Sequence, residues 1–281
     1  MEKQSTQTIL FPYDFSKESD SALEYLRSYS GKYEFNLKFL NILDSGTRKY
    51  MAENHISKAG LEQTISQMAF DFQTKYGMHS SYLIKNAPIR RIRKISLEED
   101  VTFTMIGVTE PKRSSASIMK VVSTSPVPVF VIQEGVTFQA YNKIVFPLTD
   151  AINNRQKAGW ALRIAKKCNS TIQIFSMRPD SLNSKDKEFR QFRVIDSVER
   201  FFTKNGVKCE IEIAKGAYKD FADDILKYAD DISANLLVIM IEPRKLFKPI
   251  NPYDFKLIFN PSKIPIFCVN HRDLFVGGGF Q

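Results

Sequence analysis

The chain has 281 residues, of which 43% are hydrophobic and 25% charged, and its formal net charge is +9. These values are typical of globular proteins, and no apolar run reaches the roughly 18 residues that a membrane-spanning helix needs. The first residues, MEKQSTQ, lack the apolar core of a signal peptide, so we expect a cytoplasmic protein.

The positive charge lies mainly in the second half. Split at residue 139, the two parts carry net charges of +2 and +7. A basic balance suits anionic partners, but charges of both signs are spread along the chain. The one basic cluster, within residues 87–95, has no interleaved aromatic ring for base stacking. We therefore interpret the charge as a solvated surface and expect neither nucleic acid nor a membrane as the partner.

Metal and catalytic chemistry find no support in the sequence. Three cysteines and three histidines are far apart and lack ligand or triad spacing. The cysteines lie in or beside apolar runs, which predicts buried free thiols, and the histidines are expected at the surface. These residues are Cys168, Cys209, Cys268, His55, His79 and His271.

Strand-like and helix-like segments alternate through the first half of the chain. Short apolar runs predict strands, and apolar residues three or four positions apart predict helices. The predicted strands are 7–11, 35–42, 80–85, 101–107 and 126–132, and the predicted helices are 19–31, 61–77 and 87–95.

The second half repeats this alternation. Its predicted strands are 143–147, 170–177, 208–214, 235–241 and 264–269, and its predicted helices are 153–169, 187–206 and 218–232. Helical spacing predicts the buried faces of the first two helices: Trp160, Ile164 and Cys168 in one, and Phe192, Ile195, Val198 and Phe202 in the other.

Landmarks recur at almost one offset. Pro12 and Pro147 are 135 positions apart, Gly107 and Ile241 are 134 apart, and the late strand PVPVFVI recurs as KIPIFCV. This spacing predicts two copies of one domain, 1–138 and 139–281, each an α/β domain with a doubly wound parallel sheet. The join, QEGVTFQAYN, is short, so we expect the domains to pack closely.

The chain resembles tandem universal stress proteins. The resemblance rests on ILFPYDFSKES after the first strand, on TMIG ending the fourth, and on the closing strands PVPVFVI and IPIFCV. It implies a Rossmann-like fold of the adenine nucleotide alpha hydrolase-like kind, with five parallel strands ordered 3-2-1-4-5 in each domain. Some family members bind ATP and others do not.

The resemblance also implies candidate nucleotide-site residues in the first domain. Asp14 matches the family's nucleotide-binding Asp, Pro12 before it is a further candidate, and Ile42 matches the residue that contacts the base. Gly107 matches the first glycine of a phosphate-binding loop of the form G-x2-G-x9-G-[ST]. Asp14 has an equally weighted alternative interpretation as a turn or helix-cap residue.

This loop departs from the family pattern after Gly107. Glu110 replaces the second glycine, and Lys120 and Val121 stand where Gly-Ser would be. An alternative alignment places Ser115 and Ala116 there. Lys112, Arg113 and serine hydroxyls at a helix start suit an anion, but a capped helix after a polar loop is the favoured interpretation.

The second domain differs from the family's nucleotide-site pattern more than the first does. Thr149 replaces the Asp, and Asp150 follows one place late. The loop after strand four, EPRKLFKPINPYDF, contains no glycine and three prolines, which remove N–H donors. Pro252 and Tyr253 occupy the Gly-Ser position, so we expect no triphosphate here.

These departures favour a non-enzymatic stress-response protein that acts by binding an unknown protein partner, with no cofactor and a degenerate nucleotide site in both domains. The alternative is an ATP- or AMP-binding module that uses the first domain only and binds weakly. A third hypothesis, an anion or nucleic-acid binder, rests on charge alone.

The resemblance implies pairing of the last strands, because family members commonly pair through them. An unpaired strand edge must be covered, so we expect a pseudo-twofold unit within one chain. The expected seam residues are Val129, Val131, Ile266 and Cys268. Whether two chains form a homodimer stays open.

Overall fold

The computed structural model describes residues 6–86, 92–111, 115–148, 154–179, 185–241 and 251–270. The strands are β1 Thr8–Pro12, β2 Asn36–Ile42, β3 Ser80–Lys85, β4 Phe103–Val108, β5 Val129–Gln133, β6 Lys143–Leu148, β7 Thr171–Pro179, β8 Cys209–Gly216, β9 Leu236–Ile241 and β10 Ile266–Asn270. The helices are α1 Lys17–Ser30, α2 Ser45–Glu53, α3 Lys58–Tyr76, α4 Ile92–Glu98, α5 Ser115–Thr124, α6 Asn154–Cys168, α7 Lys185–Lys204, the 3-10 turn η2 Tyr218–Asp220, α8 Phe221–Asp231 and α9 Pro252–Ile258.

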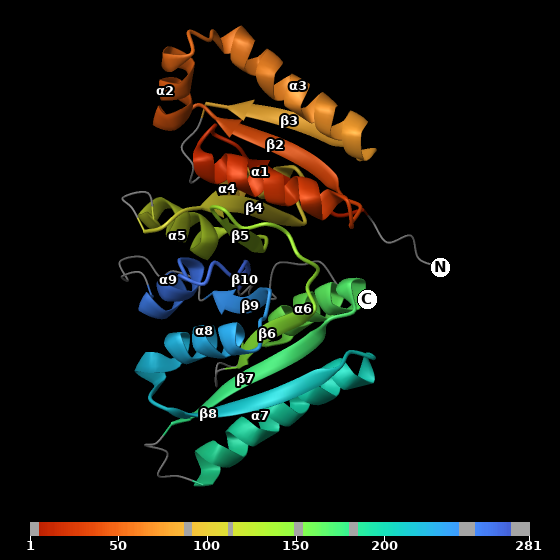
Figure 1. The fold of residues 1–281 in the computed structure, drawn as a ribbon, viewed down its shortest axis with the longest axis vertical. Coiled ribbons are helices and arrows are strands. Elements are labelled where there is room, and N and C mark those ends of the chain that lie inside the picture. The colour runs from red at the N-terminus through yellow and green to blue at the C-terminus, as the bar shows by residue number, and fades with distance from the viewer. Residues whose placement is uncertain are drawn as a thin grey trace.

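One ten-stranded sheet runs through both halves (Figure 1). Its order is β3-β2-β1-β4-β5-β10-β9-β6-β7-β8, so each half has the order 3-2-1-4-5. All strand pairs within each half are parallel. The α/β class with parallel sheets wound on both faces is therefore as predicted.

The two halves pair their strands in matching register. Ile9 pairs with Phe103 in the first half, and Ile144 pairs with Leu236 in the second. The first strands are thus offset by 135 residues and the fourth strands by 133. Gly107 consequently corresponds to Met240, and its alignment with Ile241 is wrong by one position. The offset changes because the intervening segments differ in length.

Helices cover both faces of the sheet. Helices α1, α3, α6 and α7 pack on one face, and α4, α5, α8 and α9 on the other. The apolar core on the first face joins Phe103 and Phe130 to Phe267, and the core on the second face joins Val129 to Ile266. Each of these cores therefore continues from one half into the other.

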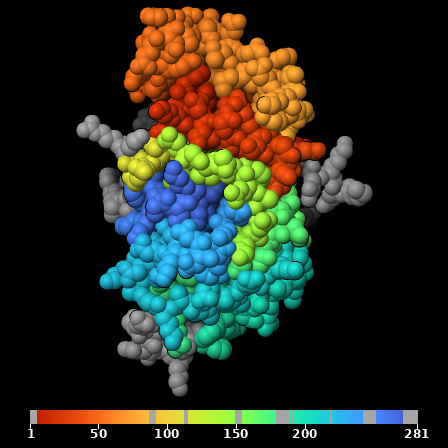
Figure 2. Space-filling view, viewed as in Figure 1, coloured from red at the N-terminus to blue at the C-terminus, as the bar shows by residue number. Residues whose placement is uncertain are grey.

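The halves meet through their last strands, and this pairing is antiparallel. Val131 lies opposite Ile266, and Val129 lies opposite Cys268. All four residues are at most 1% exposed. In Figure 2 the blue surface around α9 and β10 adjoins the yellow-green surface around α5 and β5. The antiparallel pairing gives both strand edges a partner, which removes two exposed edges from the molecule.

Side-chain amides form hydrogen bonds across one end of this junction. Gln133, the last residue of β5, donates from Nε2 to the carbonyl oxygens of Ile258 (3.3 Å) and Asn260 (2.8 Å) at the end of α9. Carbonyl groups at the end of a helix lack partners within it. A side chain of the first half therefore caps a helix of the second.

The reciprocal bonds come from the second half. Asn270, the last residue of β10, donates from Nδ2 to the carbonyl oxygens of Val122 (2.8 Å) and Ser125 (2.6 Å) at the end of α5. The junction thus has local twofold symmetry in its hydrogen bonds as well as in its strands.

Aromatic side chains fill the other end of the junction. The segment between β5 and β6 contributes Phe138 and Tyr141, and the Phe138 ring packs against the α1 residue Tyr25 and against Tyr141. The hydroxyl groups of Tyr25 and Tyr141 form a buried hydrogen bond of 2.7 Å. The short join is therefore part of the core between the halves.

Some elements differ from the sequence-based expectations. Helices α2 and α9 were not among the predicted helices. Phe192 of α7 is 49% exposed, although the rest of its predicted face is buried. Helix α6 fully buries Lys157 and three alanines, whereas the predicted face of Trp160, Ile164 and Cys168 is half-buried, packs against the core and lines a small cavity of about 40 Å³ at the junction. The helix has two buried sides because it faces the sheet and the other half at once.

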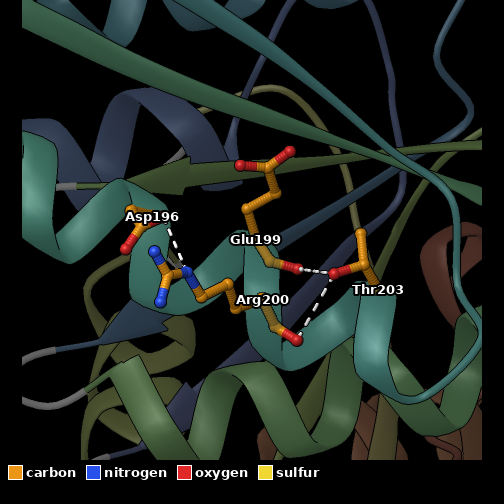
Figure 3. A network of polar contacts seen from close by, with 4 residues as sticks. All are labelled: Asp196, Glu199, Arg200 and Thr203. Carbon is orange, nitrogen blue, oxygen red and sulfur yellow. Dashed lines mark hydrogen bonds and ion pairs between the residues drawn. The ribbon is translucent and has the colours of Figure 1, made fainter.

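Around Arg200 the outer surface of α7 carries polar groups of both charges (Figure 3), and Phe189, Phe192 and Phe201 of the same helix are also exposed. Arg200 Nε donates to Asp196 Oδ1 at 2.8 Å, and Thr203 donates to the carbonyl oxygen of Glu199 at 2.9 Å. Such exposed contacts between residues four apart add little stability. Within the described residues, no helix is long and apolar enough to cross a bilayer.

Candidate functional site

A pocket of about 420 Å³ lies at the carboxyl ends of β1, β2 and β4. Strand order reverses between β1 and β4, and such switch points are where open α/β sheets form ligand crevices. The lining includes every site residue predicted from the sequence: Pro12, Asp14, Ile42, Gly107 and Ser115. Residues spread over more than 100 positions are thus brought together.

Only one carboxylate oxygen of Asp14 forms hydrogen bonds with the turn that it belongs to. Its Oδ1 accepts hydrogen bonds from Ser16 N (3.1 Å) and Ser16 Oγ (2.6 Å), and Ser16 in turn caps α1. Its Oδ2 accepts no hydrogen bond from a described residue. Both interpretations of Asp14 therefore fit the structure, because one oxygen orders the turn and the other stays available at the pocket.

The backbone beside Asp14 is strained. Phe15 has a φ of 63°, a left-handed conformation that is unusual for a bulky residue. Its ring stacks on Tyr50 of α2, with centroids 3.9 Å apart and an interplanar angle of 4°. This stacking offsets part of the conformational cost, which is of order 1–3 kcal/mol, and fixes the turn that carries Asp14.

Gly107 has a packing role. A Cβ at this position would lie 2.0 Å from the carbonyl oxygen of Glu18 and 3.1 Å from the Cβ of Ala22. Only glycine lets the first turns of α1 approach β4 this closely. The role in a phosphate loop that the resemblance implies is therefore not needed to explain this residue.

Asp44 lines the pocket and was not predicted. Its Oδ1 accepts from Thr47 N at 3.0 Å and caps α2. A Cβ placed on Gly46 would lie 3.4 Å from Asp44 Oδ1 and 4.0 Å from Asp14 Oδ2, so the two carboxylates flank one point. The available signal was its place two residues after Ile42, the end of the second strand.

Part of the pocket lining is apolar. It includes Ile106 of β4, and Ile118 and Val121 of α5. Phe259, which follows α9 in the second half, also lines it. Nothing in the sequence pattern indicates that a residue 152 positions after Gly107 reaches the same pocket. Pairing of β5 with β10 brings it there.

The described lining is acidic. Its ionisable groups include the carboxylates Asp14, Glu18, Asp44 and Glu110, and none of its residues is Lys, Arg or His. Tyr13 also lines the pocket; burial, together with its hydrogen bond to Asp20, raises its pKa well above the ordinary value, so it stays neutral. Lys112 and Arg113, which we considered for anion binding, lie outside the described residues.

The equivalent region of the second half holds a buried lysine, Lys157. Its ammonium group donates to the carbonyl oxygen of Pro147, the counterpart of Pro12, and lies 4.1 Å from the centroid of the Phe146 ring. Burial lowers the pKa of Lys157 from 10.5 to about 7. Its counterpart in the first half is Ala22. Thr149 and Asp150 lie outside the described residues.

The other second-half candidates are structural. Pro252 is the first residue of α9, and Asn251 caps that helix by accepting from Tyr253 N at 3.1 Å. The ring of Tyr253 stacks with that of Phe221, at a centroid distance of 5.9 Å. The start of α9, where a phosphate would have to bind, is thus already capped by the side chain of Asn251.

The remaining sequence predictions have mixed outcomes. Cys268 is buried, but Cys168 and Cys209 are half-buried, so the expectation of three buried thiols is wrong for two of them. His55 and His79 are exposed, as expected, and His271 lies outside the described residues. In α4, Ile92 and Ile95 are buried, and Arg93 and Lys94 are exposed. Among the described residues, no group of three or more metal-ligating side chains is assembled.

A scan against models of known protein families finds no match, and neither does a comparison with curated proteins. Solved structures do match. A universal stress protein from Archaeoglobus fulgidus DSM 4304 superposes with a TM-score of 0.68 over 95% of this chain and 99% of that one, at 18% sequence identity. This chain has the universal stress protein fold.

A second structure matches over a similar length. It is a functionally unknown protein from Pseudomonas aeruginosa PAO1, with a TM-score of 0.60 and 15% identity over 95% of this chain and 93% of that one. Each of these matches covers more than nine-tenths of both chains. The superposition establishes the universal stress protein fold. Sequence identities this low do not establish a function, which has to be argued from the site.

Proposed function

We propose that this chain is a universal stress protein-like protein that acts by binding, without catalysis, and that its ligand site is the pocket of the first half. One observation carries the proposal. Five residues chosen from the sequence converge on one pocket of about 420 Å³ at the switch point of the sheet. Pockets of this size suit a ligand of the size of a nucleoside or mononucleotide.

The proposed ligand class is an adenine nucleoside or nucleotide, held weakly. The apolar wall of Ile118, Val121 and Phe259 suits the face of a base, and the Asp14 carboxylate suits the hydroxyl groups of a ribose. The loop glycines that would cradle a triphosphate are replaced, which weakens phosphate binding.

In this proposal the second half is a structural partner. Lys157 fills the region that corresponds to the ligand site and binds the Pro147 carbonyl oxygen. The second half contributes Phe259 to the pocket of the first and covers the edge of β5. One ligand per chain is therefore expected.

Calorimetric titration of the full chain with adenosine, AMP and ATP tests the proposal. We expect one site per chain for at least one of these ligands, and Asp14→Ala should abolish binding. Asp71→Ala is the matched control, because Asp71 is an exposed carboxylate on α3, remote from the pocket. If none of the three ligands binds, or if Asp14→Ala binds like the wild type, the proposal is wrong.

A further inference from the structure

We propose that the pocket of the first half is a site shared by both halves, in which Phe259 of the second half determines the affinity for a flat aromatic base and Gln133 of the first half is its positioning residue. This inference rests on the proposed function and deepens it, because it names the residues that recognise the base. Phe259 lines the pocket together with Ile118 and Val121 of α5.

Gln133 holds the backbone on both sides of Phe259. Phe259 donates from its N–H to the carbonyl oxygen of Phe255 at 3.0 Å, but its φ of −103° and ψ of 42° depart from the helical conformation of α9. The carbonyl groups of its two neighbours, Ile258 and Asn260, both accept from Gln133 Nε2, at 3.3 and 2.8 Å. A side chain of the first half therefore sets where the second half presents Phe259.

A second buried amide holds the turn that follows Phe259. Asn260 donates from Nδ2 to the carbonyl oxygens of Leu257 and Ile264, each at 3.0 Å, and its Oδ1 accepts from Ile264 N at 2.9 Å. The chain on either side of Phe259 is thus fixed without a ligand. A ring that is already in place costs little ordering when a ligand binds.

The part of the pocket wall formed by α5 is held across the junction in the same way. Val121 lines the pocket, and the carbonyl oxygen of its neighbour Val122 accepts from Asn270 Nδ2 at 2.8 Å. The same Nδ2 donates to the carbonyl oxygen of Ser125 at 2.6 Å. The two amides that join the halves therefore also hold the two elements that supply apolar residues to the pocket, α5 and the segment of Phe259.

An aromatic ring at this place matches a base better than an aliphatic side chain does. Phe259 packs on Phe255, with ring centroids 4.8 Å apart and an interplanar angle of 42°. Removing a ring that stacks on a base lowers affinity by roughly fivefold or more. Adenosine, AMP and ATP share the adenine ring, so a residue that contacts the base should affect all three by the same factor.

Calorimetry on the full chain with adenosine, AMP and ATP tests the role of Phe259. Phe259→Leu keeps an apolar side chain, and the melting temperature checks its fold; Phe259→Met, which adapts to irregular spaces, replaces it if the Leu variant does not fold. We expect affinity to fall about five- to tenfold, equally for each ligand that the wild type binds. Phe138→Leu, an aromatic residue at the other end of the junction, is the matched control and should bind like the wild type.

The outcomes separate this inference from the proposed function. A folded Phe259 variant without the ring that binds as tightly as the wild type would overturn the inference and leave the proposed function standing. A fall for one ligand only would also overturn it, because the base is common to all three. A wild type that binds none of the three would overturn both.

A double-mutant cycle tests Gln133 as a positioning residue. Gln133→Leu should weaken binding severalfold in the wild type and have little further effect in the Phe259→Leu variant, because the ring that it positions is gone. Losses that add would indicate a merely structural role and overturn this assignment. Tyr141→Phe removes the buried hydrogen bond to Tyr25 at the other end of the junction and should leave affinity unchanged. Equal losses in Tyr141→Phe and Gln133→Leu would contradict the assignment as well.

Discussion

Gln133 and Asn270 make matching hydrogen bonds in opposite directions across the junction of the two halves. Each is the last residue of its strand, and each donates to two carbonyl oxygens at the end of a helix from the other half. The chain thus joins its halves as a symmetric dimer joins its subunits. The two copies consequently form one sheet with continuous cores.

Removing either amide should destabilise the whole chain. We expect Gln133→Leu and Asn270→Leu each to lower the free energy of unfolding by about 1–3 kcal/mol, because buried carbonyl groups lose their partners. Urea unfolding measures this, followed by the fluorescence of Trp160, the single tryptophan, which lines the junction cavity. Gln67→Leu, on the exposed face of α3, should change little. Two separate transitions in either variant would show that the halves unfold independently.

Lys157→Met should stabilise the protein at neutral pH. The wild type carries a buried ammonium group whose pKa in the folded state, about 7, lies below its ordinary value of 10.5. Below pH 7 the lysine is protonated in both states and burial costs most; as the pH rises toward 10.5 this cost disappears. The gain from Met should be on the order of 2–4 kcal/mol at pH 6.

The pH dependence is the decisive part of this prediction. Denaturant unfolding at several pH values should show the difference between Lys157→Met and the wild type shrinking as the pH rises from 7 to 10. Lys166→Met, at an exposed position of the same helix, should show no such trend. A difference that grows with pH would contradict the burial of this ammonium group.

Gly107→Ala should be strongly destabilising. The added Cβ would lie 2.0 Å from the Glu18 carbonyl oxygen, so α1 must shift away from β4, at a cost of about 1–3 kcal/mol. Thermal unfolding measures the loss. Gly159→Ala is the matched control, because nothing lies within 4 Å of its Cβ position inside α6, and helix propensity favours Ala there by up to about 1 kcal/mol. Equal melting temperatures for the two variants would refute the close approach.

The first half alone should self-associate. Residues 1–138 expose the edge of β5 and lose the partners of Phe130 and Val131, which lie opposite Phe267 and Ile266. An unpaired apolar edge pairs with another copy or aggregates. Sedimentation of this fragment over a range of concentrations should show dimers or larger species, and addition of residues 139–281 should reduce them. A fragment that stays monomeric at high concentration would refute this account.

The alternation of strands and helices was predictable because apolar residues recur with a different spacing in strands and in helices. Buried parallel strands are continuously apolar, as in LLVIMI of β9, and their recurrence at one offset predicted two copies. The resemblance then predicted the strand order. Where local signals were weak, prediction failed: α2 has only one buried residue, Thr47, and its sequence shows little apolar periodicity.

The α/β class and the recurrence of landmarks follow from the local sequence pattern, and the residues Pro12, Asp14, Ile42, Gly107 and Ser115 were chosen through the family resemblance. Residues that follow the ends of parallel strands gather at one sheet edge, whatever the rest of the chain does. Only the packing of distant segments places Phe259 at the pocket and buries Lys157, which has no carboxylate partner among the described residues. Both follow from contacts between distant segments, since the pairing of β5 with β10 and the packing of α6 set which side of each element is covered. Periodicity shows that a helix has a buried side, but only packing shows what that side contacts.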